Sequence, residues 1–167
     1  MKGISMVENS LGIVSAGMGP ERMTARETTD EMEQTGTQHL LITMPYGILG
    51  FESSKDFYLI IDPLESPFMW LQMADDVEEP QSFLVISPFV VCPEYAPDLP
   101  EEETRSIGIT KSEEAMVLNI VTLRGPNDAT INLKGPLVIN KSTLQGKQII
   151  PVNVGDFNID HPVLVES

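Results

Sequence analysis

The chain has 167 residues, enough for one domain with its own hydrophobic core, and it carries 25 acidic residues against 10 basic ones. Fifteen acidic residues and only three basic ones lie between Glu52 and Glu114, and this charge excludes direct nucleic-acid binding, because phosphates are bound mainly by Lys and Arg. The single cysteine, Cys92, excludes an intramolecular disulfide and favours a reducing compartment, and no apolar run is long enough to cross a bilayer.

The first 37 residues differ in composition from the rest of the chain. Gly, Ser, Thr, Met and Glu predominate there, and neither a helical nor a strand-like period persists. Such a segment buries too little apolar surface to offset the entropy lost on ordering, so residues 1–37 are predicted to form a disordered tail. The tail also lacks the sustained apolar stretch of a secretory signal, so a cytoplasmic location is expected.

Short apolar runs separated by Pro and Gly begin after His39. They are rich in Val, Ile, Leu and Phe and have the length of typical β-strands. The predicted strands are Leu40–Met44, Phe57–Ile61, Phe68–Met73, Phe83–Ile86, Met116–Leu123, Thr130–Leu133, Leu137–Ile139 and Gln148–Val152. The connections at residues 62–67 and 124–128 are too short for crossover helices, so neighbouring strands are expected to be antiparallel.

Only the stretch between the fourth and fifth predicted strands favours helix. Pro100 precedes three acidic residues, as in a first helical turn, and Thr110 and Glu113 have the spacing of a capping box. The β-branched run that follows favours strand, so a single helical turn is expected. The predicted fold class is therefore all-β, a small antiparallel barrel or sandwich in which residues 38–167 form one domain.

Few residues are suited to catalysis. His39 and His161 are the only imidazoles in the sequence. Cys92 lies in the apolar run 89–93, where a cysteine is usually packed and unreactive. A small hydrolase built on a Cys92–His161 pair stays open as an alternative.

The same scarcity argues against a metal or cofactor site. Two His and one Cys cannot complete a tetrahedral zinc site without carboxylates. The acidic run 75–79 lacks the Gly and the ligand alternation of a calcium loop and is read as a solvated turn. No phosphate-binding loop is present, and aromatic residues do not alternate with basic ones as on a nucleic-acid platform. The sequence therefore predicts a protein that binds without a cofactor and is not an enzyme.

The most specific local string is Met44–Phe51. It combines a proline that ends a strand with two glycines, Gly47 and Gly50, that permit positive φ in a compact loop. The strings that follow it are Ser66–Gln72, Phe83–Phe89, Thr130–Asn140 and Gly146–Ile150. In this order and spacing they resemble the FliW family of bacterial flagellar assembly factors, over about Leu40 to Ile150.

The resemblance implies a small β-barrel-like protein without enzymatic activity. Members of the family bind CsrA, a small basic dimer that represses translation by covering ribosome-binding sites on messenger RNA, and they relieve the repression allosterically. Flagellin competes for them, so the level of free flagellin controls flagellin synthesis. The acidic region between Glu52 and Glu114 is compatible with these expectations, because it attracts a basic protein and repels RNA.

The Pro-rich segment from Pro88 to Pro100 and the acidic residue after it are the first candidate for partner binding. Aromatic anchors within an acidic rim suit a basic protein partner. The predicted binding residues are Phe89, Glu94, Tyr95, Asp98 and Glu101. Phe89 is equally suited to the core, whereas the Tyr95 hydroxyl is expected to tolerate a half-exposed position.

Other residues of the matched strings are expected to serve the fold. Trp70 lies in a continuous apolar run and is assigned to the core. Asn132 and Asn140 flank a turn at Pro136, and their side chains are expected to bind turn backbone. A dedicated flagellin chaperone without a role in translation remains an alternative function.

Overall fold

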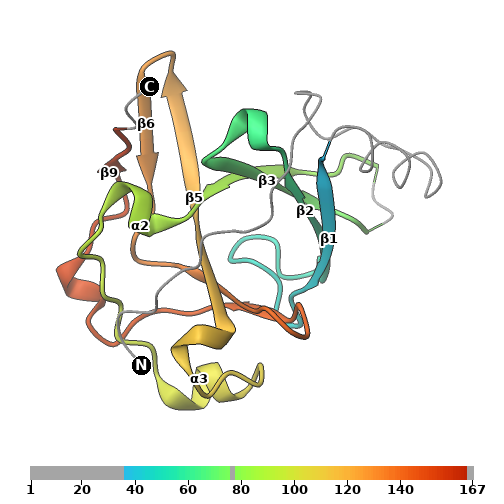
Figure 1. Ribbon diagram of the computed structural model, residues 1–167, viewed down its shortest axis with the longest axis vertical. Coiled ribbons are helices and arrows are strands. Elements are labelled where there is room, and N and C mark those ends of the chain that lie inside the picture. Colours follow the sequence, from blue (N-terminus) through green and yellow to red (C-terminus); the bar gives the residue numbers. More distant parts are fainter. Residues whose placement is uncertain (1–35, 76–77, 165–167) are drawn as a thin grey trace.

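A computed structural model describes residues 36–75 and 78–164 of the chain (Figure 1). The predicted tail, apart from Gly36 and Thr37, lies outside the described residues, so its disorder stays a prediction. In the described residues, strands predominate and the helices are short.

Nine strands of the described part form one sheet, and neighbouring strands are antiparallel throughout. They are β1 (Gln38–Thr43), β2 (Asp56–Ile61), β3 (Phe68–Met73), β4 (Ser82–Ile86), β5 (Ala115–Gly125), β6 (Asp128–Ile131), β7 (Leu137–Asn140), β8 (Gly146–Gln148) and β9 (His161–Pro162). The predicted all-β, antiparallel class is confirmed, since the predicted runs from Leu40–Met44 to Leu137–Ile139 each overlap one of the strands β1 to β7.

The long strand β5 joins the two parts of the sheet. Its first half pairs with β7, its second half pairs with β6, and β4 pairs with its middle. The strand order β1-β2-β3-β4-β5-β6-β9 has two ends, and a single parallel bridge from Thr43 to Gln145 links β1 to the turn before β8. The sheet is therefore not closed into a barrel. Of the two forms predicted, the sandwich-like open sheet is the one that fits.

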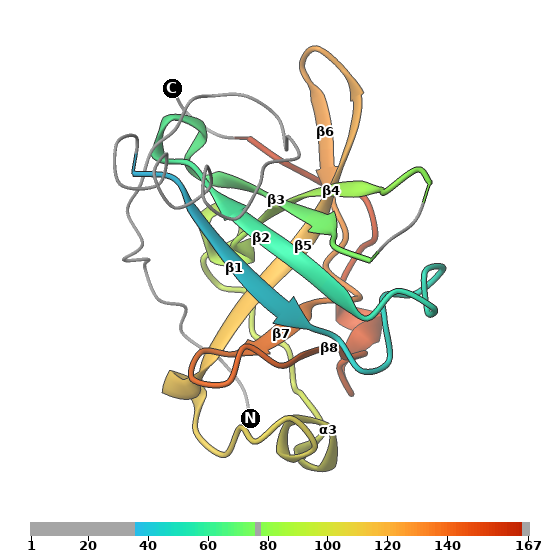
Figure 2. The same ribbon diagram turned by 90° about the vertical axis from the view of Figure 1, so that its right-hand side faces the viewer.

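The core lies between the two parts of the folded sheet. Alternate residues of β2 and β3, among them Phe57, Leu59 and Leu71, are fully buried, as expected for strands that bury one face. Leu118 of β5 and Leu137 of β7 complete the same cluster from the other side. Figure 2 shows the corresponding arrangement, with β1 and β2 lying across β5 and β7.

The helices are single turns. Helix occurs before β5 as expected, but the stretch contains two turns rather than one, α3 (Glu101–Arg105) and the 3-10 turn Ser112–Glu114. The cap differs by one residue from the predicted Thr110–Glu113 box, because the Glu114 carboxylate accepts from the backbone N–H groups of Thr110 (2.8 Å) and Lys111 (3.2 Å). These two hydrogen bonds hold the pKa of Glu114 below its usual range.

Three short turns and the strand β9 were not predicted, and β8 was predicted only at Gln148. α2 (Pro88–Val91) and the 3-10 turns Pro63–Glu65 and Val154–Asp156 have three or four residues each, too few to display a helical period. The two-residue strand β9 is likewise too short for alternation to be visible.

The predicted strand Gln148–Val152 is wrong. β8 ends at Gln148, and the residues that follow it have no strand pairing. Ile149 is nevertheless buried, in a cluster with Leu99 and Ile109, and its N–H donates to the Pro136 carbonyl at 3.0 Å. The apolar run therefore reflects burial of a loop rather than a strand.

The structure confirms the expected role of the two turn asparagines but not the expected burial of Trp70. Asn132 and Asn140 bind turn backbone as predicted, since their side-chain oxygens accept from the N–H groups of Lys134 (2.9 Å) and Ser142 (2.8 Å). Trp70 is only half-buried, because it lies on the face of β3 opposite the buried Leu71. The period of the strand places it there although the run is apolar throughout.

Gly47 is required by the conformation of the loop between β1 and β2. Its φ is +68°, and a Cβ at this position would lie 2.6 Å from the Cα of Glu52 and 2.7 Å from the carbonyl oxygen of Phe51. Both atoms belong to the backbone, so they cannot move aside as a flexible side chain can. The loop therefore depends on glycine for its handedness and for its close approach.

Replacing Gly47 by alanine is expected to lower the free energy of unfolding by roughly 1–3 kcal/mol, because the substitution combines left-handed strain with a backbone clash. Chemical denaturation followed by circular dichroism measures the effect. Gly155→Ala is the matched control, since a Cβ there meets no atom within 4 Å and its φ is not in the left-handed region. Equal stability of the two variants would contradict the account of the loop.

Candidate protein-binding surface

The five predicted binding residues lie within residues 88–101, hereafter the binding segment, which comprises the connection after β4 and the first residue of α3. Glu94, Asp98 and Glu101 are exposed, whereas Phe89 is partly buried and contacts two core clusters. The structure thus places the three carboxylates at the surface and the aromatic rings beneath them. The expectation that Phe89 is equally suited to the core agrees with its position.

Tyr95 is not half-exposed, as expected from its hydroxyl, but only 2 % exposed. Its hydroxyl donates to the backbone carbonyl of Leu133 at 2.7 Å, and its ring lies edge-on to Phe157 with the centroids 4.8 Å apart. Burial raises the pKa of Tyr95 well above its usual range, so the hydroxyl stays protonated and remains a donor. In this structure Tyr95 ties the binding segment to β6 and to the turn that follows it.

The loop formed by residues 149–153 lies next to the binding segment, although its residues were not among the predicted binding residues. The N–H of Val152 donates to the Asp98 carbonyl at 2.7 Å, the N–H of Asp98 donates to the Asn153 side chain at 2.8 Å, and that side chain donates to the Ala96 carbonyl at 3.1 Å. These contacts bring Val152, which is 67 % exposed, next to the acidic residues.

A signal for these exposed apolar residues is present in the sequence. Ile149 and Pro151 are buried whereas Ile150 and Val152 are exposed, so the loop alternates as a half-buried strand does. The alternation is concealed because every position is apolar. Val152 is therefore the exposed apolar side chain beside these carboxylates, whereas the predicted anchor, Tyr95, is buried.

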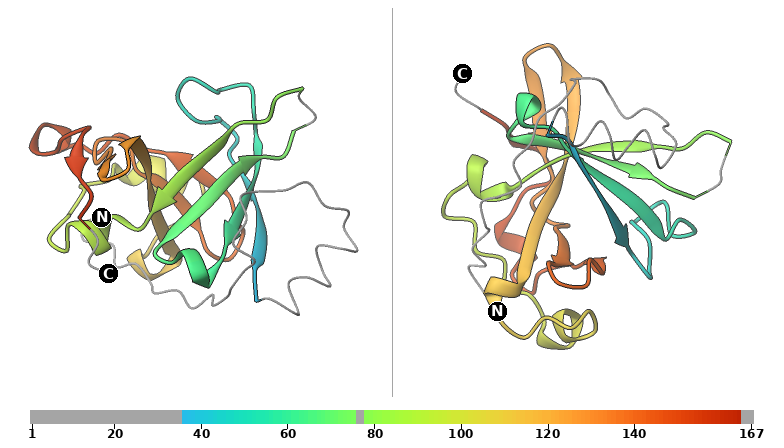
Figure 3. Two further views of the ribbon diagram at one scale, coloured as in Figure 1. Left: turned by 90° about the horizontal axis from the view of Figure 1, so that it is seen from above. Right: turned by 45° about the vertical axis from the view of Figure 1, so that its right-hand side comes forward.

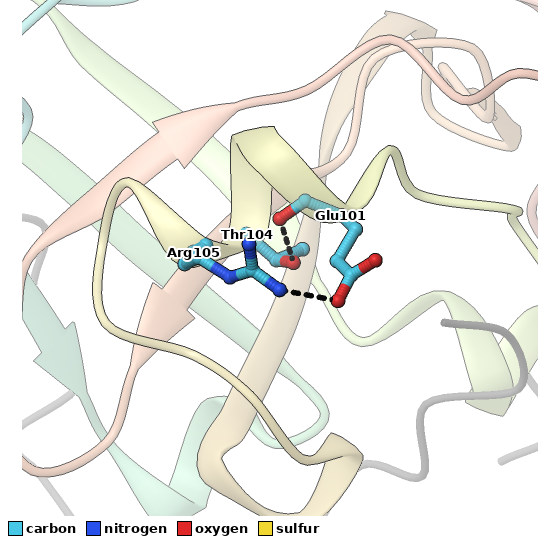
Figure 4. Close-up of polar contacts among 3 residues, drawn as sticks. All are labelled: Glu101, Thr104 and Arg105. Atoms are coloured by element: carbon cyan, nitrogen blue, oxygen red, sulfur yellow. Dashed lines mark hydrogen bonds and ion pairs between the residues drawn. The ribbon is translucent and has the colours of Figure 1, made fainter.

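Glu101 lies at the first turn of α3, at the end of the binding segment (Figure 4). Its carboxylate pairs with Arg105 at 2.5 Å, and its carbonyl accepts from the Thr104 hydroxyl at 3.1 Å. Glu101, Thr104 and Arg105, together with Ile109 and Thr110, line a hollow of about 200 Å³. Both charged side chains are largely exposed, so the pair is weak and the carboxylate can accept a partner's cation in place of Arg105.

The surroundings of Cys92 do not favour its use as a nucleophile. Burial, followed by the charge of Glu94, raises the pKa of the Cys92 thiol and so disfavours the nucleophilic thiolate. Cys92 packs against the cluster that contains Ile86 and Tyr95. Within residues 36–75 and 78–164, no three His, Cys, Asp or Glu side chains are grouped so that they could hold a metal ion, and no helix is long and apolar enough to cross a membrane.

Comparison with known proteins gives one consistent result. The sequence model of the FliW protein family matches residues 25–163. The flagellar assembly factor FliW of Leptospira interrogans is 43% identical over 119 residues, which cover 70% of this chain and 78% of that protein. The corresponding protein of Borreliella burgdorferi is 38% identical over 124 residues, 73% of this chain and 92% of its own length. A crystal structure of the flagellar assembly factor FliW superposes with a TM-score of 0.64 at 31% identity, covering 74% of this chain and 85% of that one.

Replacing Tyr95 by phenylalanine is expected to lower the free energy of unfolding by about 1–2 kcal/mol at neutral pH, because the buried Leu133 carbonyl loses its donor. The raised pKa of Tyr95 adds a pH dependence. The protonated hydroxyl of Tyr95 contributes its full stabilisation below the ordinary tyrosine pKa of about 10. This contribution is lost as the pH rises towards the pKa of Tyr95 in the folded state. The variant should therefore lose less stability than the parent chain under alkaline conditions.

Urea denaturation across neutral and alkaline pH measures both effects. Tyr58→Phe is the control, because Tyr58 is 42 % exposed, and its free energy of unfolding should change by no more than about 0.5 kcal/mol. A Tyr95→Phe variant as stable as the parent would show that the hydroxyl does not support the segment.

Proposed function

Because this chain belongs to the FliW family of flagellar assembly factors, we propose that it binds a CsrA-type translational repressor, relieves its repression allosterically, and is itself bound by flagellin. In this role it acts in the cytoplasm, without enzymatic activity and without a cofactor. The observation that carries the proposal is the family match over residues 25–163. Free flagellin would then control flagellin synthesis by occupying the antagonist of the repressor.

The charge of the surface supports a basic protein as the partner. The exposed residues of the binding segment and of α3 include Glu94, Asp98, Glu101 and Glu102, and the nearby base Arg105 is already paired with Glu101. Carboxylates concentrated in this way accelerate encounters with a cationic protein and disfavour RNA. Direct binding to nucleic acid is therefore not part of the proposal.

The predicted residues take different parts in the proposed interface. Glu94, Asp98 and Glu101 contact the basic partner, while Phe89 and Tyr95 hold the binding segment in place from beneath. Val152 supplies apolar area beside Asp98. An apolar centre within a charged rim is the usual composition of a transient protein interface.

Two measurements test the function itself. The purified chain should capture the CsrA-type repressor of the same bacterium at low salt, and it should restore translation of a repressed flagellin message in a cell-free assay. Capture of flagellin without any effect on translation would instead favour the dedicated chaperone. If the substitutions Cys92→Ala and His161→Ala abolished the activity of the chain, the hydrolase alternative would replace both the repressor antagonist and the chaperone.

If carboxylates steer the encounter, the association rate should fall by about tenfold or more between low salt and physiological ionic strength, where the Debye length is about 8 Å. The double substitution Glu94→Gln with Asp98→Asn should slow association at low salt and leave dissociation nearly unchanged. Stopped-flow or surface-based kinetics measure both rates.

Asp128→Asn is the matched control for this experiment. Asp128 is exposed in the β5–β6 hairpin, which lies at the opposite end of the molecule from α3 (Figures 1 and 2). Its neutralisation should alter the association rate by less than about twofold, because a charge outside the proposed interface contributes only to the overall field and not to the local attraction. An association rate independent of salt and of all three substitutions would remove the electrostatic part of the proposal.

A further inference from the structure

Two of the most exposed apolar side chains lie outside the binding segment, on the loop Met44–Phe51, hereafter the apolar loop. Tyr46 is 61 % exposed and Leu49 is 76 % exposed, although Ile48, which directly precedes Leu49, is buried. The loop extends from the sheet on the same side as the end of β3 (Figure 3). The segment that follows the loop is joined to the segment after β3, because the N–H of Lys55 donates to the Asp75 carboxylate at 3.2 Å.

The apolar loop is held in one conformation by its own hydrogen bonds. Its backbone N–H groups at Gly47 and Phe51 donate to the carbonyls of Met44 (2.8 Å) and Ile48 (2.6 Å). The Phe51 ring packs edge-on against Phe83 with the centroids 5.1 Å apart. Tyr46 and Leu49 are thus presented on a rigid support, so this loop loses little conformational entropy when a partner contacts it.

β8 joins the apolar loop to the rest of the acidic surface. The Gln148 side chain accepts from the N–H of Leu49 at 2.8 Å and donates to the Gly135 carbonyl at 3.1 Å. The ammonium group of the preceding residue, Lys147, lies 4.4 Å from the centroid of the Tyr46 ring and also pairs with Glu103 of α3. The apolar loop therefore continues directly into α3 and the proposed interface.

The charges around the apolar loop are mainly carboxylates. Glu52 accepts from the N–H of Gly50 at 3.0 Å, which holds the pKa of this exposed carboxyl below its usual range. Asp75 accepts from the N–H of Lys55, and Glu103 pairs with Lys147, which lies over the Tyr46 ring. The two lysines here are already engaged, Lys147 as described and Lys55 by the carbonyl of Glu52. The loop thus presents two apolar side chains within an acidic rim.

We propose that the apolar loop is a second contact surface for the basic repressor, with Leu49 and Tyr46 as its apolar anchor. The complementary patch carries an aliphatic side chain flanked by Lys or Arg, because this chemistry matches both the exposed apolar pair and the carboxylates around it. The inference rests on the proposed function, since it assigns a further part of the interface with the same partner. It differs from that proposal in placing contacts on the β1–β2 connection rather than on residues 88–101.

The test compares two leucines of equal exposure. Leu49→Ser removes the anchor, and Leu64→Ser is the control, because Leu64 is 75 % exposed and lies in the turn at the other end of β2. Isothermal titration of the full-length parent chain and of each variant with the CsrA-type repressor, and separately with flagellin, gives the dissociation constants. Thermal melts establish that all three proteins are equally folded.

Leu49→Ser is expected to weaken binding of the repressor by about tenfold or more, with Leu64→Ser within about twofold of the parent. Repressor binding by Leu49→Ser that equals the parent, an equal loss in Leu64→Ser, or a loss confined to flagellin would each overturn the assignment while leaving the proposed function in place. A parent chain that binds neither protein would overturn the proposed function and this inference with it.

Discussion

The rest of the structure depends on the pairing of β5 with three other strands. β5 is hydrogen-bonded to β4, β6 and β7, and its side chains enter all three core clusters, Val117 in one, Leu118 in another and Val121 in the third. A strand that is buried on both faces along much of its length must be apolar at almost every position. Among the buried positions of β5 the exception is Asn119, which is fully buried and donates to the Asn132 carbonyl at 2.6 Å.

The binding segment follows from this central strand. It leaves the sheet after β4 and passes over the outside of the core, where Tyr95 reaches the carbonyl of Leu133, and it returns through α3 to the start of β5. Both of its ends are therefore set by strands that pair with each other. This arrangement lets exposed carboxylates occupy fixed positions on a loop, which is where recognition residues are usually found.

Much of the fold could be predicted because its signals are local. Runs such as Phe57–Ile61 have the composition of strands, and short connections leave antiparallel pairing as the only choice. Asn132 and Asn140 could be assigned to turns because asparagine binds backbone two residues ahead. The choice between a closed barrel and an open sheet could not be predicted, because closure depends on how β1 meets the turn before β8, a contact between residues about a hundred positions apart.

The surface was only partly predictable for the same reason. The acidic character of the region is a property of composition and was visible, whereas the depth of each side chain is a tertiary property. Tyr95 is buried because Phe157 and Leu133 cover it, and both come from distant parts of the sequence. Leu49 and Val152 are exposed for the opposite reason, since the residues beside them in the chain, Ile48 and Pro151, already fill the interior.

The position of Lys147 couples Tyr46 to α3, since the same ammonium group serves the aromatic ring and Glu103. An incoming cation that takes over Glu103 would free Lys147 for the ring, and a ligand that displaces the ring would strengthen the hold of Glu103 on Lys147. Binding at the Tyr46 ring would thereby change the affinity for a cation at Glu103, and the reverse, through exchange of a counter-ion and without any rearrangement of the sheet.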